Sequence, residues 1–261
     1  MTRNEKWLLE EKYSGVVTPE YKADRERLAC GEPAAYVIGW QPFLGLKIYL
    51  DSKPLIPRPE TEYWTEQLLS KVRTSDVLTF LDLCAGSGAI GCAALARLPE
   101  AQVYFGELDP AHEATIRKNI RENGLDESPA FAKASAGKRA DIRIGDLFEP
   151  FAGMRFDIIA ANPPYIPDQR ELPASVSDHE PALALRAGPD GLAVIRRIAA
   201  ELPRHLAPGG EAWIECDSAH ATPRGTVGCE AARALFAAEG LTAEIRTDQY
   251  GKPRVVVASF A

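Results

Sequence analysis

One glycine-rich segment has the residue types and spacing of a ligand-binding loop. It reads DLCAGSGAIG from Asp82 to Gly91, follows a short apolar run and precedes an alanine-rich one. Gly86 and Gly88 permit a tight turn whose backbone N–H groups face a ligand at the start of a helix. The spacing G-x-G-x-x-G also fits a dinucleotide, so NAD(P) stays open at this point.

Acidic residues at two strand ends favour a cationic ligand over a pyrophosphate. Asp82 ends the first apolar run and suits an amino group, whereas Glu107 ends the next run and suits ribose hydroxyls. S-adenosylmethionine carries an amino group, a ribose and a positively charged sulfonium. We therefore expect it as the cofactor, with S-adenosylhomocysteine as the product and no metal.

A second segment, Asn162-Pro163-Pro164-Tyr165, follows another apolar run and has features of a methyl-acceptor site. The prolines fix the backbone and remove two N–H donors. The Asn162 carboxamide oxygen and the Pro163 carbonyl can each accept a proton from a substrate NH2 group, and Tyr165 can lie over a flat group. Two acceptors would stabilise positive charge developing on a methylated nitrogen and would aim that nitrogen at the methyl donor. Asn162, Pro163 and Tyr165 are therefore the predicted catalytic residues.

Strand-like and helix-like segments alternate around these two loops. The predicted strands are Val77–Leu83, Gln102–Leu108, Asp141–Gly145, Phe156–Ala160, Gly210–Cys216 and an antiparallel edge pair, Thr242–Arg246 with Arg254–Phe260. The predicted helices are Thr61–Val72, Ala89–Leu98, Pro110–Asn123, Ile195–Leu206 and Cys229–Glu239. This order predicts an α/β fold with a doubly wound, mainly parallel, seven-stranded, Rossmann-like sheet.

The chain divides into a small N-terminal region, residues 1–53, and a larger domain, residues 54–261. The first region is predicted to hold helices at Asn4–Glu11 and Thr18–Gly31 and a strand pair within Ala35–Leu50. Residues 126–139 have little periodicity and are predicted to form a flexible insertion. Pro163–Gly191 is a long loop with six prolines, which is typical of a functional or a disordered segment.

Composition excludes several protein classes. The chain has 261 residues, 46% of them hydrophobic, but no apolar run near the ~20 residues that a membrane span needs, and no signal-peptide pattern at its start. A net charge of −7 disfavours direct nucleic-acid binding. The five scattered cysteines are expected to be small buried hydrophobes and not a disulfide framework or zinc site. A cytoplasmic monomer is expected.

From about Arg27 onward, the chain resembles class I S-adenosylmethionine-dependent methyltransferases, and within them the release-factor glutamine methyltransferases (the HemK/PrmC family). The segments that carry this resemblance, besides the two loops, read GEPAAY at 31–36, LIPRPETE at 55–62 and HEPAL at 179–183. The resemblance implies that the cofactor contacts Ala85, Gly86, Ser87, Gly88, Ala89, Glu107, Asp146, Leu147 and Asn162. It implies that Asn162, Pro163, Pro164 and Tyr165 bind the substrate glutamine.

The resemblance also implies the reaction, namely methylation of the N5 side-chain nitrogen of the glutamine in the Gly-Gly-Gln motif of class I peptide-chain release factors. Methylation of an amide needs no general base, so His179 is expected to order its loop. Two departures stand out, since only about 30 residues precede Gly31 and Leu147 replaces a larger aromatic residue. Ribosomal-protein glutamine methylation, nucleic-acid adenine-N6 methylation and a catalytically idle binding factor stay open as alternatives.

Overall fold

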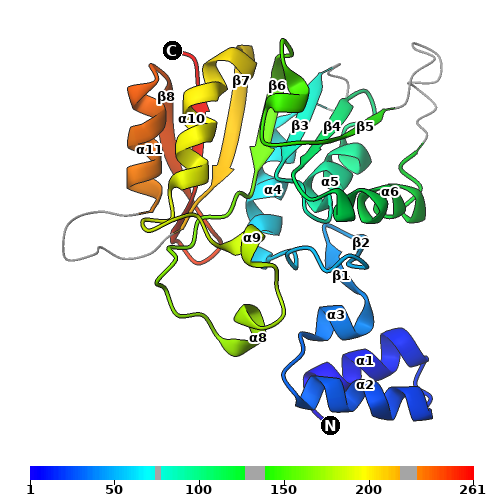
Figure 1. Cartoon of the computed structure of the whole chain (residues 1–261). Helices are drawn as coiled ribbons and strands as arrows, with labels where there is room; N and C mark the ends of the chain where they lie inside the picture. Colours follow the sequence, from blue (N-terminus) through cyan, green and yellow to red (C-terminus); the bar gives the residue numbers. More distant parts are fainter. Residues whose placement is uncertain (74–77, 127–138, 218–227) are drawn as a thin grey trace.

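The protein is built on a seven-stranded sheet with the order β5-β4-β3-β6-β7-β9-β8. The computed structural model describes residues 1–73, 78–126, 139–217 and 228–261 (Figure 1). The strands are β3 (Thr79–Leu83), β4 (Gln102–Glu107), β5 (Ala140–Ile144), β6 (Phe156–Ala161), β7 (Leu206–Glu215), β8 (Thr242–Thr247) and β9 (Pro253–Ser259). The predicted mainly parallel sheet is confirmed, and only the two pairings of β9 are antiparallel.

Helices cover both faces of the sheet, as predicted for a doubly wound fold (Figure 1). They are α4 (Pro59–Lys71), α5 (Ala89–Arg97) and α6 (Glu113–Glu122) on one face, and α10 (Ala193–His205) and α11 (Cys229–Ala238) on the other. Alternation along each strand creates the two cores, since Phe80 packs with α4 and α5 whereas Leu81 and Leu83 pack with α10 and α11. Burial of each such side chain contributes about 1.5–3 kcal/mol to the free energy of folding.

The last strand, β9, runs antiparallel to both of its neighbours, β7 and β8. The predicted antiparallel pair of C-terminal strands is confirmed, with Ile245 opposite Val256. β9 inserts between β7 and β8, so that β8 alone forms this edge of the sheet. The strands β8 and β9 thus complete the part of the sheet on which α11 packs.

The N-terminal region contains three helices and a hairpin that lie beyond the carboxyl edge of the sheet (Figure 1). The helices are α1 (Arg3–Tyr13), α2 (Pro19–Ala29) and α3 (Ala34–Ile38), and the hairpin pairs β1 (Trp40–Phe43) with β2 (Leu46–Tyr49). The strand pair predicted from Ala35 therefore starts later than expected. Residues 34–38 become helical because Val37 and Ile38 are buried against α1 and α2, and Gly39 ends the helix at a φ of 99°.

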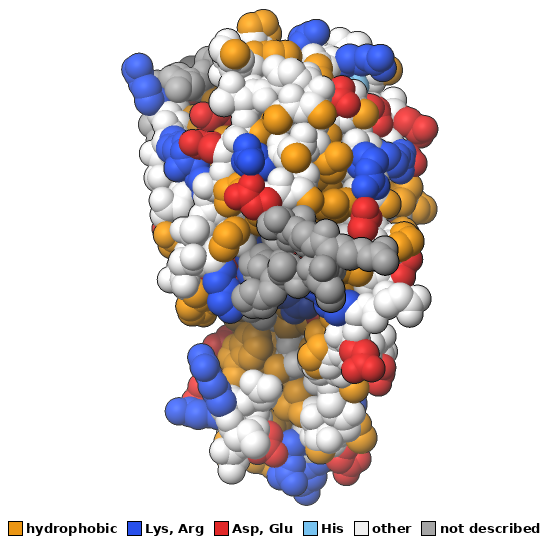
Figure 2. All heavy atoms as spheres, turned by 90° about the vertical axis from the view of Figure 1, so that its left-hand side faces the viewer, with side chains coloured by type: hydrophobic (Ala, Val, Ile, Leu, Met, Phe, Trp, Pro, Cys, Tyr) orange, Lys and Arg blue, Asp and Glu red, His pale blue; other side chains and the backbone are white. Residues whose placement is uncertain are grey.

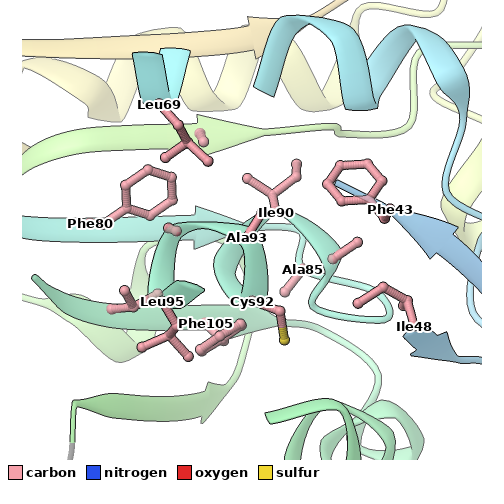
Figure 3. Packing of buried hydrophobic residues seen from close by; sticks show 14 of the residues in the cluster. Phe43, Ile48, Leu69, Phe80, Ala85, Ile90, Cys92, Ala93, Leu95 and Phe105 are labelled. Carbon is pink, nitrogen blue, oxygen red and sulfur yellow. The ribbon is translucent and has the colours of Figure 1, made fainter. Parts of the chain in front are cut away.

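The hairpin shares the core of the sheet domain. Phe43 and Ile48 pack in the same cluster as Phe80, Ile90 and Phe105 (Figure 3). The division of the chain at residue 53 stays a prediction. The insertion predicted at 126–139 lies outside the described residues except for its two ends.

Two cysteines form a disulfide that the sequence analysis did not expect. Cys216, just after β7, is bonded to Cys229 at the start of α11, with their Cα atoms 5.4 Å apart. Both are buried, as expected of small hydrophobic residues, but the fold also places the end of β7 beside α11. Cys92 is buried and unbonded as predicted, whereas Cys30 is exposed. None of the helices in the described ranges is long and apolar enough to cross a membrane.

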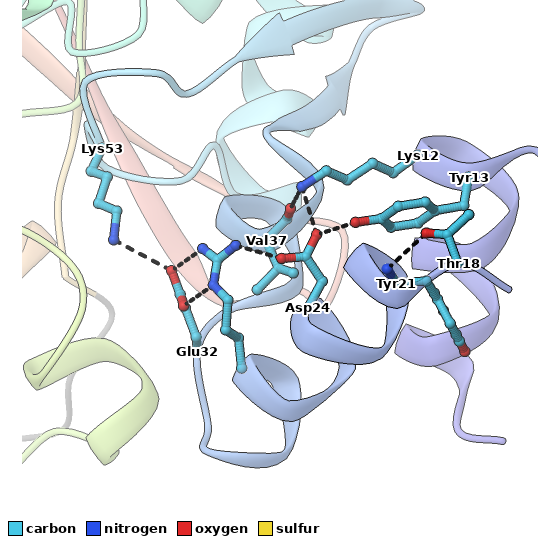
Figure 4. Close-up of polar contacts among 9 residues, drawn as sticks. Lys12, Tyr13, Thr18, Tyr21, Asp24, Glu32, Val37 and Lys53 are labelled. Carbon is cyan, nitrogen blue, oxygen red and sulfur yellow. Dashed lines mark hydrogen bonds and ion pairs between the residues drawn. The ribbon is translucent and has the colours of Figure 1, made fainter.

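Ion pairs join the N-terminal helices to one another (Figure 4). Asp24, in α2, accepts hydrogen bonds from Lys12 and Tyr13 of α1, each at 2.7 Å. Arg27 donates to Asp24 at 2.7 Å and to both oxygens of Glu32 at 2.8 Å. The bidentate pair fixes the turn between α2 and α3.

Acid is expected to destabilise this helical region. Hydrogen bonds from Arg27 lower the pKa of Glu32 from 4.5 to about 2. A carboxyl group whose folded pKa is lowered adds stability above its unfolded pKa, and that stability is lost as the pH falls from about 4.5 towards 2. We expect urea denaturation to show that wild type loses about 1–2 kcal/mol more than Glu32→Gln between pH 6 and pH 2.5. Equal losses in the two proteins would contradict this assignment.

Candidate active site

A cavity of about 280 Å³ lies at the carboxyl edge of the sheet. Strand β3 pairs with β4 on one side and β6 on the other, so the chain order reverses there. In an open α/β sheet, ligands bind in the crevice at such a switch point. The walls come from the carboxyl ends of β3, β4, β5 and β6 and the residues after them, the starts of α4 and α5, residues 55–57, the loop at 181–186 and α10.

The structure brings most of the predicted cofactor-binding residues to this cavity. The predicted residues that line it are Ala85, Gly86, Ser87, Ala89, Glu107, Asp146, Leu147, Asn162 and Pro164. The glycine-rich loop and the Asn-Pro-Pro-Tyr corner, about 75 residues apart in the chain, thus face one space. Asp82, Gly88, Pro163 and Tyr165 are not among the lining residues.

Glu107 holds the glycine-rich loop at the end of β4. Its Oε2 accepts a hydrogen bond from the Gly86 backbone N–H at 2.7 Å, and its Oε1 accepts one from Asp109 at 2.8 Å. Its side chain is nearly buried and borders the cavity. A carboxylate fixed in this way is oriented to receive hydroxyl donors from a ligand, as predicted for a ribose.

Asp82 lies at the end of β3, as expected, but it is not among the residues that line the cavity. It is fully buried, and its Oδ2 accepts a hydrogen bond at 2.8 Å from the Gly91 backbone N–H in the first turn of α5. It shares the strand face of Phe80, so it points beneath the loop. Burial raises the pKa of its carboxyl well above the usual range, and the Gly91 N–H opposes that shift. Its other carboxylate oxygen, Oδ1, has no hydrogen-bond partner among the described residues, so its contact with a ligand amino group stays a prediction.

Asn119, on α6, ties the same loop to the N-terminal hairpin. Its Nδ2 donates to the Ser87 carbonyl at 2.8 Å and to the Tyr49 carbonyl at 3.0 Å. Its Oδ1 accepts from the Tyr49 N–H at 2.7 Å, and the side chain is fully buried. Sequence reasoning missed this residue because nothing in a helical run marks an asparagine that reaches two other elements.

Replacing Asn119 by alanine is expected to weaken both folding and cofactor binding. Three backbone groups, the Ser87 carbonyl in the interior and the half-buried N–H and carbonyl of Tyr49, would lose their partner, which costs about 2–4 kcal/mol of unfolding free energy in urea denaturation. Calorimetry should also show weaker S-adenosylmethionine binding, because the Ser87 carbonyl is released. Asn123→Ala is the matched control, since Asn123 bonds the Lys47 N–H and carbonyl of the hairpin but not the loop. Equal cofactor affinities in the two variants would refute the link through Ser87.

Charged and strained residues border the far end of the cavity. Asp146 forms an ion pair with Arg197 of α10, with Oδ2 and Nη2 2.8 Å apart, and both residues line the space. Cys84 and Leu147 also line the cavity. Their backbone φ angles are positive, 60° and 48°, which is rare for residues other than glycine. Arg197 was not predicted, because an arginine on the polar face of a helix has no distinguishing sequence signal.

The proline-rich corner is held by one polar contact in the cavity wall, between Asn162 and Thr61, and by a second one behind it, between Tyr165 and Glu215. Asn162 donates through Nδ2 to Thr61 Oγ1 at 3.2 Å, and Tyr165 donates through its hydroxyl to Glu215 Oε1 at 3.0 Å. The Tyr165 ring packs against the core of the α10–α11 face, so its contact with a flat substrate group stays a prediction. Burial raises the pKa of Glu215, whereas hydrogen bonds from Trp64, Thr61 and Tyr165 lower it.

The long loop reaches the cavity through an ion pair. Glu180 is buried, bonds the guanidinium of Arg58, and accepts from the Ile56 N–H at 3.1 Å. This pairing brings Pro181 and the short helix α9 (Ala182–Leu185) over the space. A second short helix, α8 (Ala174–Ser177), precedes it. His179 is half-buried and is not among the lining residues, which agrees with a role within its loop.

The comparison with known proteins identifies the family. A family model described as "Conserved hypothetical protein 95" matches residues 57–207. A release factor glutamine methyltransferase of Caulobacter vibrioides is 36% identical over 224 residues, which is 85% of this chain and 71% of the relative. The chain belongs to the release factor glutamine methyltransferase family. The predicted resemblance is thereby confirmed.

Other relatives extend the match to different lengths. The relative from Mycolicibacterium smegmatis, of the same name, is 33% identical over 92% of this chain and 81% of its own length. The relative from Geobacter sulfurreducens is 37% identical over 72% of this chain, and the chain spans only 62% of that relative. Some curated relatives are therefore considerably longer than their match to this chain.

Solved structures show the same fold at low identity. A methyltransferase from Pyrococcus furiosus matches with a TM-score of 0.54 and 15% identity, over 91% of this chain and 98% of its own. A precorrin-6y C5,15-methyltransferase from Geobacter metallireducens matches with a TM-score of 0.50 and 13% identity, over 84% and 100%. The predicted class I methyltransferase fold is confirmed.

Proposed function

We propose that the protein transfers a methyl group from S-adenosylmethionine to the N5 side-chain nitrogen of a glutamine in a class I peptide-chain release factor. The observation that carries this proposal is that the glycine-rich loop and Asn162 line one cavity in a chain of this family. A methyl donor on the loop and an amide held at the corner would therefore meet in the same space.

The lining residues suit the cofactor chemically. Glu107 offers carboxylate oxygens for ribose hydroxyls, and Asp146 offers an acceptor for an amino group of a purine. Apolar side chains, including Leu83, Ile90 and Leu147, provide walls for a flat base. When bound, the cofactor supplies an electrophilic methyl group on a sulfonium.

The corner residues would orient the substrate nitrogen. The Asn162 carbonyl oxygen and the Pro163 carbonyl would each accept one amide proton, which holds the amide with its nitrogen lone pair facing the methyl group; the nitrogen loses its conjugation only as the new N–C bond forms. Positive charge that develops on the nitrogen is stabilised by the same oxygens. The proton is lost to solvent after transfer, because the methylated nitrogen is then acidic.

The proposal includes the setting in which the enzyme works. The release factor is the protein partner, and the enzyme is a cytoplasmic monomer that needs no metal and binds no nucleic acid directly. On the face drawn in Figure 2, basic and acidic side chains are interspersed among the described residues, so this face shows no phosphate-binding stripe. The N-terminal region, residues 1–53, would contribute to substrate docking.

A methyl-transfer assay tests the proposal directly. The protein is incubated with methyl-labelled S-adenosylmethionine and a class I release factor, and the modified residue is located by mass spectrometry. Label is expected on the glutamine of the Gly-Gly-Gln motif and is expected to vanish when that glutamine is replaced by alanine. Ribosomal proteins, tRNA, rRNA and DNA are tested in parallel. Label confined to a ribosomal protein or to an adenine base would overturn the release-factor assignment.

A further inference from the structure

A buried carboxylate lies directly behind the candidate methyl-acceptor corner. Glu215, at the end of β7, is 1% exposed. Its Oε2 accepts hydrogen bonds from Thr61 Oγ1 and from Trp64 Nε1, both at 2.7 Å. Its Oε1 accepts the hydrogen bond of Tyr165, so one carboxylate contacts both α4 and the corner.

The hydrogen bonds around Glu215 have a defined direction. An indole nitrogen can only donate, and a carboxylate that receives three donors acts as an acceptor at each contact. A hydroxyl has a single proton. Because Thr61 donates that proton to Glu215, its oxygen can only accept a hydrogen bond from any other neighbour. Asn162 lies on that other side, 3.2 Å from the Thr61 oxygen.

The direction of these bonds determines how the Asn162 amide is turned. Only its NH2 group can donate to the lone pair of Thr61, so its carbonyl oxygen must face the opposite way. A flipped amide would place its oxygen against the Thr61 oxygen, and no proton would remain between them. An unpaired acceptor in such a partly buried place is unfavourable.

We propose that Glu215, acting through Thr61, fixes the polarity of the Asn162 amide so that the corner accepts substrates that present an N–H2 group and rejects those that present only an acceptor. Thr61 and Glu215 are thus positioning residues that select a primary amide over a carboxylate or a carbonyl. The inference rests on the proposed function, since it concerns the same methyl-acceptor site.

Two substitutions at Thr61 separate polarity from packing. Thr61→Val keeps the shape of the side chain but removes the lone pair and the proton, whereas Thr61→Ser keeps both. Thr61→Val is expected to lower kcat/KM for the release factor about 10- to 100-fold, with cofactor affinity by calorimetry within about twofold of wild type. Thr61→Ser is expected to stay within about threefold of wild type. Full activity in Thr61→Val, or an equal loss in both variants, would overturn the inference.

A double-mutant cycle adds a readout that a purely structural role would not change. In single-turnover assays, Thr61→Val is expected to cause no further loss in an Asn162→Ala background, because it acts only through Asn162. Independent, multiplying losses would overturn the inference. If the wild-type protein methylates no release factor, the proposed function fails instead. The orientation of the Asn162 amide is then measured by NMR. A contact between the Asn162 side-chain NH2 and the Thr61 methyl supports the inference, and the absence of that contact refutes it.

Discussion

Replacing Asn162 by alanine is expected to lower the rate of methyl transfer about 10²- to 10³-fold, the usual effect of removing one preorganised polar group from a transition state. The alanine removes the side-chain oxygen that would accept a substrate proton, and the Pro163 carbonyl alone cannot hold the nitrogen in line with the methyl group. Asn162 lines the cavity beside Pro164, and its amide is held by Thr61. The measurement is kcat under saturating release factor and S-adenosylmethionine.

The control for this variant is cofactor binding. S-adenosylmethionine affinity should change little although Asn162 is one expected cofactor contact, because the other contacts are untouched and Glu107 still accepts the Gly86 N–H. Asn123→Ala, an amide substitution just after α6 and outside the cavity, should retain methyl transfer. If Asn162→Ala keeps more than about a tenth of wild-type activity, the assigned role of the corner is wrong.

Substituting Gly191 by alanine is expected to cost about 3 kcal/mol of unfolding free energy and to lower methyl transfer at least about 10-fold. An alanine Cβ would lie 2.4 Å from the Tyr165 carbonyl oxygen and 2.9 Å from Pro167 Cδ. Gly191 also has a φ of 73°, which adds backbone strain for any other residue. The clash is with the backbone of Tyr165 in the corner and with Pro167 just after it, so the packing between residue 191 and the corner must change.

Gly153→Ala separates the two causes. Gly153 has a similar φ of 77°, but nothing lies within 4 Å of its added Cβ. It should cost only the backbone strain, about 1 kcal/mol, and leave methyl transfer unchanged. Urea denaturation and kcat are measured for both variants. Equal losses of stability and activity would show that φ alone, and not contact with Tyr165, matters at Gly191.

The elements that sequence patterns predicted best are those whose signal is local. The glycine-rich loop, the capped start of α2 and the run of strands and helices from β3 to β9 follow from turn residues and short-range periodicity. The segment at 34–38 was predicted less well, because its apolar, β-branched residues suit a strand. Tertiary contacts with Leu8 and Tyr21 made it helical instead.

The candidate site shows the same division. Its lining by Glu107 and Asn162 was predictable, since residues at the carboxyl ends of parallel strands must share one edge of the sheet, whereas Asp146 was expected from the resemblance to the family. The orientation of the Asp82 side chain, which is buried beneath the glycine-rich loop, was not predictable. It depends on which face of the sheet each residue of β3 points to. The partners of Glu215 were not predictable either, because Thr61 and Trp64 lie 154 and 151 residues away in sequence.

By itself, then, the order of amino acids determined the alternating architecture, the two functional loops and the family to which they belong, because each is encoded in neighbouring residues. Folding in three dimensions decided that Asn119 ties the hairpin to the loop, that Cys216 bonds Cys229, and that Glu215 orients Asn162 through Thr61. These depend on which distant side chains meet in a packed interior, and that is set by the geometry of the whole chain.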